Sequence, residues 1–484
     1  ETLATESPTE TIQLENWGMP FSREDDGTVS QRPFGGLSYP RTTYAGAETG
    51  HHLLHTLYEQ TVKRGIDVYD EYYVTRLAVT DDDDPGNREC HGLVAYDIQS
   101  GEIVGFSARE GIVLATGGPG QVYDHTTNAV ANTGDGYAMA YRAGVPLEDM
   151  EFVQFHPTSL PSTGVLISEA VRGEGGILYN AEGERFMYEG GYATNWGEVA
   201  SRDVVSRAEL TEINEGRGFE DDHVLLDMRH LGEERILDRL ENIVHLAEDF
   251  EGVDALEDPM PVKPGQHYQM GGIETNEYGE TVVDGLYAAG ECACVSVHGS
   301  NRLGGNALPE LFVFGKLAGR AAAGDDMGEA QISVGRTGDV EEGSVETPVE
   351  PGALSAETDS GVAADGGTAS TVEEAVETER ERVETLLDRD AGINHADIRD
   401  RVQTTMTENV NVFREEARLK QALRDIRQAR EDYRDVSVSD PSRTFNTDLV
   451  HTIETRNVID LAEAITLGAL ARTEFRGAHW RAEH

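Results

Sequence analysis

Two apolar strands that each run directly into glycine constrain the fold of this 484-residue chain more than any other feature. The first, IVLATGG, covers residues 112–118, and the second, GLYAAGE, covers residues 285–291. A strand that ends at glycine lets the backbone approach a bound cofactor closely, because no Cβ atom stands in the way. Either junction alone could be an ordinary turn between a strand and a helix. Together they predict a doubly wound α/β domain assembled from segments far apart in the sequence.

The pattern of apolar residues along the chain predicts both strands and helices. Residues 47–64 predict a helix with Leu53, Leu54 and Leu57 on one face. The other expected elements are strands at 66–80, 92–115 and 285–291 and helices at 134–144, 233–248 and 309–323.

The chain changes in character after residue 325. Residues 326–370 are rich in Asp, Glu, Gly, Ser and Thr and lack hydrophobic periodicity, so we predict a flexible acidic insertion. Three helical patterns follow, at 371–389, 397–412 and 413–433, and predict a small helical bundle. One more helix is expected at about 456–472.

The charge balance excludes some classes of partner and indicates an environment. The chain carries 90 acidic against 39 basic residues, a formal charge of −51, so it does not bind nucleic acid through its general surface. A disordered acidic protein is one explanation, but 38% apolar residues and clear periodicity argue against it. The other is a folded protein from a salt-loving organism, in which counterions screen the acidic surface. The scarcity of lysine favours this halophilic interpretation, since only Lys63, Lys263, Lys316 and Lys420 occur.

Other residue types exclude further classes. Cys90, Cys292 and Cys294 are too few for a disulfide framework in a chain of this length, and C-x-C is not a redox or zinc spacing. His51 and His55 have no suitably spaced acidic or cysteine partner, so we expect a helix surface and no metal site. No run approaches the ~20 apolar residues that span a membrane. The chain begins with Glu instead of Met, so we expect the native start to be absent.

The most specific signal is a series of motifs that keep basic groups in an otherwise acidic chain. Arginine in a glycine loop binds a carboxylate in bidentate fashion, and histidine and serine side chains add hydrogen bonds to carboxylate oxygens. The motifs are MEFVQFHPTSL (150–160), GVLISEAVRGEGG (164–176), SRDVVSR (201–207), HYQMGG (267–272), CVSVHGSNRLGGNAL (294–308), FNTDL (445–449) and RGAH (476–479).

The identity, order and spacing of these motifs resemble the flavoprotein subunit of succinate dehydrogenase and fumarate reductase, from about residue 12 to the end. The resemblance implies FAD as cofactor and a C4 dicarboxylate as substrate. It also implies an iron–sulfur subunit and membrane anchor subunits as partners, holding the chain peripherally on the cytoplasmic face of the cell membrane. The family's G-x-G-x-x-G motif is absent from the chain. That motif, and the histidine that carries FAD covalently in many members, are expected upstream of Glu1.

The resemblance also assigns roles to individual residues, and it implies no metal ligand. Arg202 is the expected proton-transfer residue, with Glu169 and Arg172 as its proton pathway. The residues expected to bind the substrate are His156, Ser168, His267 and Arg302. The residues expected to contact FAD are Gly117, Gly118, Asp135, Glu291, Ala307 and Leu308.

The implied fold class is α/β and α+β multidomain, with an FAD-binding doubly wound (Rossmann-like) domain, an inserted capping domain and a helical domain. We expect the capping domain to close over the substrate, so that His267 on one domain faces His156 and Arg202 on the other. The expected parts are an FAD-binding domain at 1–150 and 267–325, the capping domain at 151–266, the acidic insertion at 326–370, the helical domain at 371–440 and a C-terminal segment at 441–484.

Two alternatives stay open at this point. L-Aspartate oxidase shares several of the motifs, although the loop at 294–308 and the segment at 267–272 are more similar to the respiratory enzymes. A non-catalytic acidic interaction protein is the alternative from another class. The sequence does not separate succinate oxidation from fumarate reduction, because direction depends on the flavin potential and the partner subunits.

Overall fold

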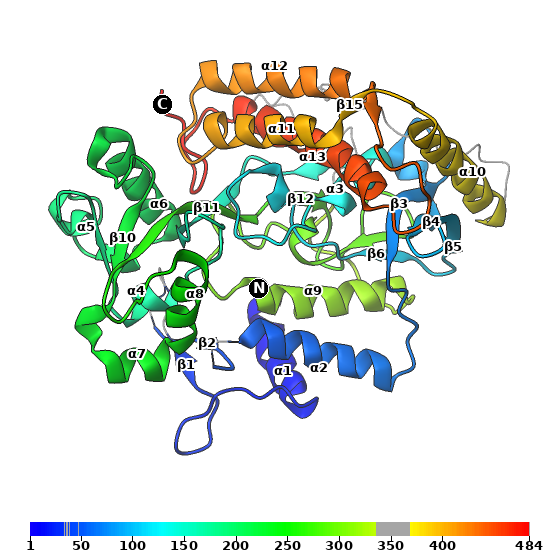
Figure 1. Ribbon diagram of the computed structural model, residues 1–484. Helices are drawn as coiled ribbons and strands as arrows, with labels where there is room; N and C mark the ends of the chain where they lie inside the picture. Colours follow the sequence, from blue (N-terminus) through cyan, green and yellow to red (C-terminus); the bar gives the residue numbers. More distant parts are fainter. Residues whose placement is uncertain (33, 35–36, 38, 47, 335–367, 484) are drawn as a thin grey trace.

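The computed structural model describes residues 1–32, 34, 37, 39–46, 48–334 and 368–483 (Figure 1). The predicted mixed α/β and α+β multidomain arrangement, with a separate capping part and a helical part, is confirmed. Most of the predicted acidic insertion, residues 335–367, lies outside the described residues.

The N-terminal helices lie together on one side of the molecule, next to a helix from much later in the chain (Figure 1). The helix predicted at 47–64 is confirmed, but its apolar face was predicted wrongly. Leu53 is buried, whereas Leu54 is 66% exposed and Leu57 is 37% exposed. The elements are α1 (Thr2–Asn16), β1 (Gln31–Arg32), β2 (Thr42–Thr43), α2 (Thr49–Lys63) and α9 (Ala307–Ala322).

A three-stranded antiparallel sheet follows, and the helix α10 (Thr368–Leu387) covers it (Figure 1). Helix and sheet approach closely because Gly92 and Gly105 have no side chains: a Cβ on either would lie within 2.7 Å of a Val372 methyl group. The strand predicted at 92–115 is in fact three strands with turns between them. The sheet consists of β3 (Tyr72–Val79), β4 (Cys90–Asp97) and β5 (Glu102–Ser107), and β6 (Ile112–Leu114) lies outside it. The three strands that replace the predicted one are β4, β5 and β6.

The two strand-to-glycine junctions of the sequence lie side by side. The strands β6 and β13 (Leu286–Ala288) pair in parallel, with Ile112 opposite Leu286 and Leu114 opposite Ala288. Their carboxyl ends therefore deliver both glycine loops to the same edge, as expected for a cofactor site in an α/β fold. Near them lie α3 (Asp135–Arg142) and a small sheet of β7 (Leu147–Glu148), β12 (Gly272–Glu274) and β14 (Ala293–Cys294).

The capping part has its own sheet, in the order β8-β11-β10-β9, and its own hydrophobic core. The helix predicted at 233–248 is two helices, because Leu240 leaves the helical conformation (φ −136°, ψ 19°). The strands are β8 (Val153–Ser159), β9 (Ile177–Tyr179), β10 (Val224–Asp227) and β11 (Met260–Gln269). The helices are α4 (Ala170–Glu174), α5 (Phe186–Glu189), α6 (Arg202–Glu212), α7 (Glu233–Arg239) and α8 (Glu241–Glu251).

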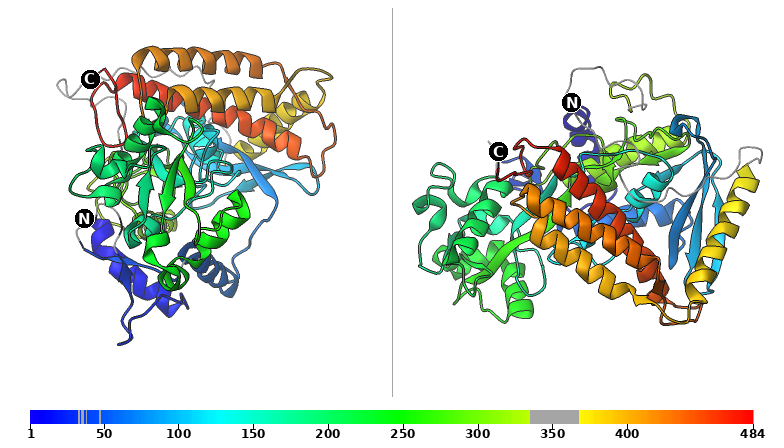
Figure 2. Two further views of the ribbon diagram at one scale, coloured as in Figure 1. Left: turned by 60° about the vertical axis from the view of Figure 1, so that its left-hand side comes forward. Right: turned by 90° about the horizontal axis from the view of Figure 1, so that it is seen from above.

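The helical bundle contains different helices from those predicted (Figure 2). Its members are α11 (His395–Asn409), α12 (Glu416–Tyr433) and α13 (Thr447–Ala471), whereas α10, expected in the bundle, lies on the antiparallel sheet. The helix predicted at 456–472 starts nine residues earlier, at Thr447. A short parallel pair, β15 (Ile393–Asn394) and β16 (Val436–Ser437), joins the bundle at one end.

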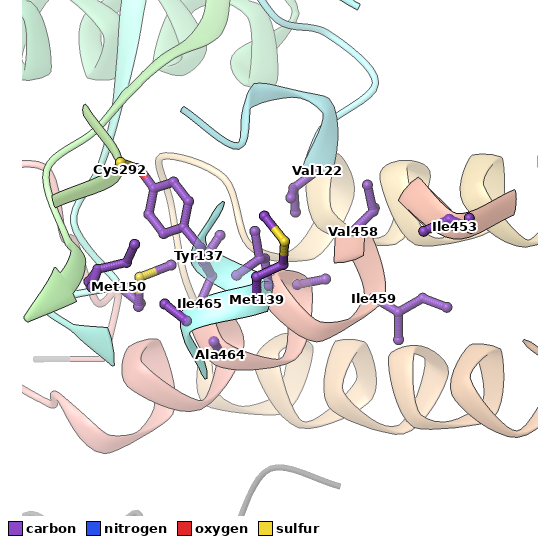
Figure 3. Packing of buried hydrophobic residues seen from close by; sticks show 14 of the residues in the cluster. Val122, Tyr137, Met139, Met150, Cys292, Ile453, Val458, Ile459, Ala464 and Ile465 are labelled. Atoms are coloured by element: carbon purple, nitrogen blue, oxygen red, sulfur yellow. The ribbon is translucent and has the colours of Figure 1, made fainter. Parts of the chain in front are cut away.

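The long helix α13 ties the bundle to the cofactor part. Figure 3 shows Tyr137 and Met139 of α3 packed near Ile459 and Ile465 of α13. Polar side chains of α13 are buried too: Asp460 forms a 2.6 Å ion pair with Arg142 of α3. No helix of the described ranges is long and apolar enough to cross a membrane.

Candidate active site

The candidate site is built on the neighbouring strands β8 and β11. His267 is an extra residue on β11, since Gln266 before it and Tyr268 after it face consecutive residues of β8. Such a bulge redirects a side chain. Here the ring centres of His267 and His156, which lies on β8, are 5.0 Å apart.

Because β8 and β11 are paired along their length, the prediction that His267 meets His156 across two closing domains is wrong. The two histidines belong to one sheet, and the strand pairing sets their separation. The predicted boundary between residues 266 and 267 falls inside β11.

Both histidines are held in the neutral form. The backbone N–H of Thr158 donates to Nδ1 of His156 (3.2 Å), which leaves Nε2 as the ring atom that carries the proton. The hydroxyl of Thr127 lies 2.7 Å from Nδ1 of His267. Burial first, and then the positive charge of Arg202, lower the pKa of both rings well below the usual value. A neutral imidazole N–H can donate to a carboxylate oxygen.

Arg202 is the first residue of α6 and lies at the end of the predicted proton pathway. Its Nη2 and Nε donate to Oε2 of Glu169, at 2.8 Å and 3.1 Å. The other carboxylate oxygen of Glu169 lies 3.6 Å from Nη2 of Arg172. All three side chains are buried. The structure therefore brings Arg202, Glu169 and Arg172 together as a continuous row.

Arg302 reaches the same place from the loop before α9. Its Nη2 donates to Oε1 of Gln154 (3.3 Å), the atom that also accepts from Nη1 of Arg202 (2.9 Å). The Arg302 guanidinium lies over the ring of Tyr268, 4.2 Å from its centre, and its Nε has no hydrogen-bond partner among the described residues. Burial, with Arg202 adding to it, lowers the pKa of Arg302 to about 10, so the group remains a cation.

The site therefore holds two buried guanidinium groups that share one amide oxygen. Glu169 opposes one of them, and two neutral histidines lie alongside. Buried cations are stable only when anions or acceptors satisfy them. The arrangement has capacity left for an anion, and planar bidentate donors suit a carboxylate.

Ser168, the fourth predicted substrate ligand, lies directly before Glu169. Its hydroxyl oxygen accepts from the backbone N–H of Ala170 at 3.2 Å, at the start of α4. The side chain is half-buried, and its contact with a substrate stays a prediction.

Three of the predicted cofactor contacts meet at the ends of β6 and β13. A Cβ added to Gly118 would lie 2.1 Å from Oε1 of Glu291, so the two loops touch only because this position is glycine. Gly117 is in the left-handed conformation (φ +69°), and of the described residues only the Asn132 amide lies near the position of a Cβ, at 3.9 Å. Burial raises the pKa of Glu291 to about 7, although the N–H of Gln269 donates to it. A side-chain-free cradle beside a buried acid fits the hydroxyl groups and backbone of a dinucleotide such as FAD.

The remaining predicted cofactor residues lie at the starts of two helices. Ala307 and Leu308 begin α9, where the first N–H groups have no partner within the helix and can donate to a ligand oxygen. The Asp135 carboxylate, at the start of α3, accepts instead from Thr133 (2.9 Å) and Asn457 (2.6 Å). Its contact with a cofactor stays a prediction.

Sequence reasoning missed Gln154, which joins the two arginines. Its amide nitrogen donates to Oδ1 of Asn301 (2.7 Å) and to the carbonyl of Arg302 (2.6 Å), and these bonds fix the amide orientation. A signal was present, because Gln154 precedes His156 by two residues and so lies on the same face of a strand.

Comparisons with known proteins agree with this geometry. A family described as FAD binding domain matches residues 1–308, and one described as fumarate reductase flavoprotein C-term matches residues 399–484. The fumarate reductase flavoprotein subunit of Mycobacterium tuberculosis (strain ATCC 25618 / H37Rv) is 42% identical over 100% of this chain and 78% of that protein. The succinate dehydrogenase flavoprotein subunit of Rickettsia bellii (strain RML369-C) is 40% identical over 100% of this chain and 77% of that protein.

Solved structures give the same result. A quinol–fumarate reductase with menaquinol molecules matches with a TM-score of 0.85 and 38% identity, over 99% of this chain and 78% of that chain. The Sdh1 complex of Mycobacterium smegmatis with UQ1 matches with a TM-score of 0.78 and 34% identity, over 100% of this chain and 76% of that chain.

Proposed function

Since the chain belongs to the family of succinate dehydrogenase and fumarate reductase flavoprotein subunits, we propose that it catalyses hydride transfer between a C4 dicarboxylate and FAD. The reaction is oxidation of succinate to fumarate, or its reverse. Bound FAD supplies the two-electron chemistry. The residues of this chain bind the dicarboxylate, orient it and move the proton.

The observation that carries the proposal is the pair of buried arginines joined by Gln154. Arg302 and Arg202 offer cationic donors in a chain whose net charge is −51. His156 and His267, both neutral, add N–H donors without adding charge. Two carboxylates of one small substrate match two such donor groups, which supports a dicarboxylate over a monoacid.

Arg202 is the proposed proton-transfer residue. Arginine gives up a proton reluctantly, so the proton has to be replaced by neighbouring groups as it leaves. Glu169 accepts two hydrogen bonds from Arg202 and lies beside Arg172, which supports a relay along this row. His156, His267, Ser168 and Arg302 are the proposed substrate ligands. On the cofactor side, Gly117, Gly118, Asp135, Glu291, Ala307 and Leu308 are the proposed FAD contacts.

The test is flavin content together with succinate-to-dye electron transfer, on full-length protein in molar KCl. We expect bound flavin and succinate oxidation that malonate inhibits. Arg302→Ala should raise the KM for succinate at least tenfold while flavin stays bound, because one anion donor is lost. Oxidation of aspartate alone, with release of hydrogen peroxide, would assign the chain to L-aspartate oxidase instead. Protein without flavin would overturn the enzymatic proposal.

We further propose that electrons pass to an iron–sulfur subunit and then to membrane anchor subunits that carry quinone. The chain would then lie peripherally on the cytoplasmic face of the cell membrane. Support comes from relatives named as flavoprotein subunits and from a matching complex with menaquinol. Purification of the native protein should recover it with these subunits from washed membranes.

The acidic composition supports a halophilic origin as well. Repulsion among 90 acidic side chains is screened by salt, because the Debye length falls from ~10 Å at 0.1 M to ~3 Å at 1 M ionic strength. We expect the unfolding temperature to rise with KCl concentration into the molar range. A flat or falling dependence would contradict the halophilic assignment.

A further inference from the structure

A second buried acid lies on the same helix as Arg202. Glu209 follows Arg202 by seven residues, two turns along α6, and therefore lies on the same helix face. Its side chain is fully buried in the core of the capping part, and neither carboxyl oxygen has a hydrogen-bond partner among the described residues. An unpaired buried carboxyl group is costly, so its presence calls for a partner or a role.

The candidate partner is the far end of the proton pathway. Arg172 is fully buried, and its Nη1 donates to the backbone carbonyl of Glu198 at 2.6 Å. Its Nε and Nη2 make no hydrogen bond among the described residues, although Nη2 lies 3.6 Å from Glu169. Against the effect of burial, the positive charge of Arg172 lowers the pKa of Glu209, and Glu209 in return raises the pKa of Arg172.

The unpaired donors of Arg172, on α4, and the unpaired acceptors of Glu209, on α6, are both buried, and the two charges lie within electrostatic reach of each other. Buried groups of this kind suit an ordered water, which needs two to four polar partners. Arg172 offers two N–H groups and Glu209 offers two oxygens. A water between them would satisfy both side chains and connect them for proton exchange.

The pKa of Glu209 is shifted in the opposite direction from that of Glu212. Burial raises its pKa well above the ordinary value, with Arg172 opposing the rise. One turn further along α6, burial also raises the pKa of Glu212, but hydrogen bonds from Arg217 and others bring it to about 2. The carboxylate of Glu198, from the segment before α6, is tied to Arg185 at 2.7 Å. Burial therefore favours the neutral form of Glu209, whereas Glu212 on the same helix is ionised.

We propose that Glu209 extends the row Arg202–Glu169–Arg172 as its proton store, exchanging a proton with the Arg172 end through an ordered water. Glu209 does not touch the substrate and acts through Arg172. In fumarate reduction, one O–H bond of Glu209 breaks as the row restores the N–H bond that Arg202 has given up. The new carboxylate is stabilised by Arg172 and later regains a proton from solvent. Succinate oxidation runs the same transfer backwards, and no oxidant or reductant beyond FAD is needed.

The experiment uses full-length, FAD-loaded protein and rests on the proposed function. Glu209→Gln keeps the shape and polarity of the side chain but cannot exchange a carboxyl proton. Glu212→Gln is the matched control, with the same chemical change on the same helix at an ionised acid. Infrared spectra near neutral pH should show, beside the contribution of Glu291, a protonated-carboxyl band in wild type and Glu212→Gln that is lost in Glu209→Gln.

Kinetics provide the second measurement. In Glu209→Gln we expect kcat to fall roughly tenfold, within the range of acid–base contributions, with the KM for succinate within about twofold of wild type. The pH profile of kcat should lose one limb. Glu209→Met, which replaces the unpaired polar group by an apolar one of similar size, should fold at least as stably and show the same kinetic loss.

Two results would overturn the proton store while leaving the dehydrogenase function intact. One is a missing infrared band, and the other is an unchanged kcat and pH profile in both Glu209 variants of an active enzyme. A wild-type protein with bound flavin but no succinate turnover would overturn the proposed function itself, and the proton store with it.

Discussion

Replacing Gln154 by leucine tests whether one amide holds the two arginines of the site in place. Gln154 is 1% exposed and makes four hydrogen bonds to the site loop and to both guanidinium groups. Leucine has a similar volume, so Gln154→Leu removes these bonds with little change in packing. It leaves donors of Arg202 and Arg302 unpaired in a buried region.

The size of the effect follows from the contacts. A hydrogen bond to a charged group contributes ~1.5–3 kcal/mol. The 2.9 Å contact with Arg202 belongs to that range, and the 3.3 Å contact with Arg302 to its lower end or below. Part of the loss appears in the free energy of unfolding. We assign ~2.7 kcal/mol to transition-state binding, which corresponds to a fall in kcat/KM of about 100-fold.

The charged variant Gln154→Glu separates geometry from charge. It keeps an acceptor between Arg202 and Arg302 but adds a negative charge where a substrate carboxylate is needed. We expect the KM for succinate and the inhibition constant for malonate to rise at least as much as in Gln154→Leu. The free energy of unfolding should not decrease, since both arginines keep their partner.

The assay is steady-state succinate–dye reduction, with flavin content and chemical unfolding measured on the same preparations. The control is Gln403→Leu, because the Gln403 amide donates to the Gln121 carbonyl (2.8 Å), a bond that involves none of Gln154, Arg202 and Arg302. This control should lose some stability and no kcat/KM per bound flavin. If Gln154→Leu keeps wild-type kcat/KM and malonate affinity with full flavin, the shared amide does not organise the site.

Three further predictions concern the relay, the cofactor and pH. Arg202→Lys should lower turnover by at least ~10³-fold with flavin still bound, since an ammonium cannot reproduce the fork that engages Glu169 and Gln154; measurable turnover near the wild-type rate would remove the proton-transfer assignment. Gly118→Ala should lower flavin content severalfold, because its Cβ would displace the carboxylate of Glu291. A ratio of flavin absorbance to protein absorbance equal to that of wild type would argue against a cofactor contact at Gly118. Burial and the charge of Arg414 lower the pKa of His479 from 6.5 to about 3, so the folded state binds a proton at this ring more weakly than the unfolded chain does. The contribution of His479 to the free energy of unfolding should therefore be fully present above pH 6.5. It should be lost progressively as pH decreases toward 3, and the loss should be at most ~5 kcal/mol. His479→Gln should reduce that pH dependence in chemical unfolding, and an unchanged slope would show that other groups control it.

Local patterns were enough to identify the chemistry of the site. Glycine after an apolar strand allows close approach of the backbone, and β6 and β13 do meet as a parallel pair. The residues predicted for the proton pathway form a row because two of them, Glu169 and Arg172, lie three apart on one turn. These inferences succeeded because each depends on a short segment and its own geometry.

Periodicity failed where the covering partner is distant in sequence. It predicted a bundle that included α10, but α10 covers β3, β4 and β5, where two glycines let it approach. It placed the start of α13 too late, because a helix buried on nearly all sides has no single apolar face. A sequence pattern shows which residues avoid water, but not which surface covers them.

The sequence by itself determined the family and the cofactor class, and it supplied the residues that are proposed to bind the substrate. Only the tertiary structure decided that a bulge on β11 points His267 at His156, that Gln154 joins Arg202 to Arg302, and that Glu209 has Arg172 as its charged neighbour. The physical reason is that hydrogen bonds and charge interactions depend on distances of a few ångströms between groups from separate segments. Those distances are set by the packing of the whole chain.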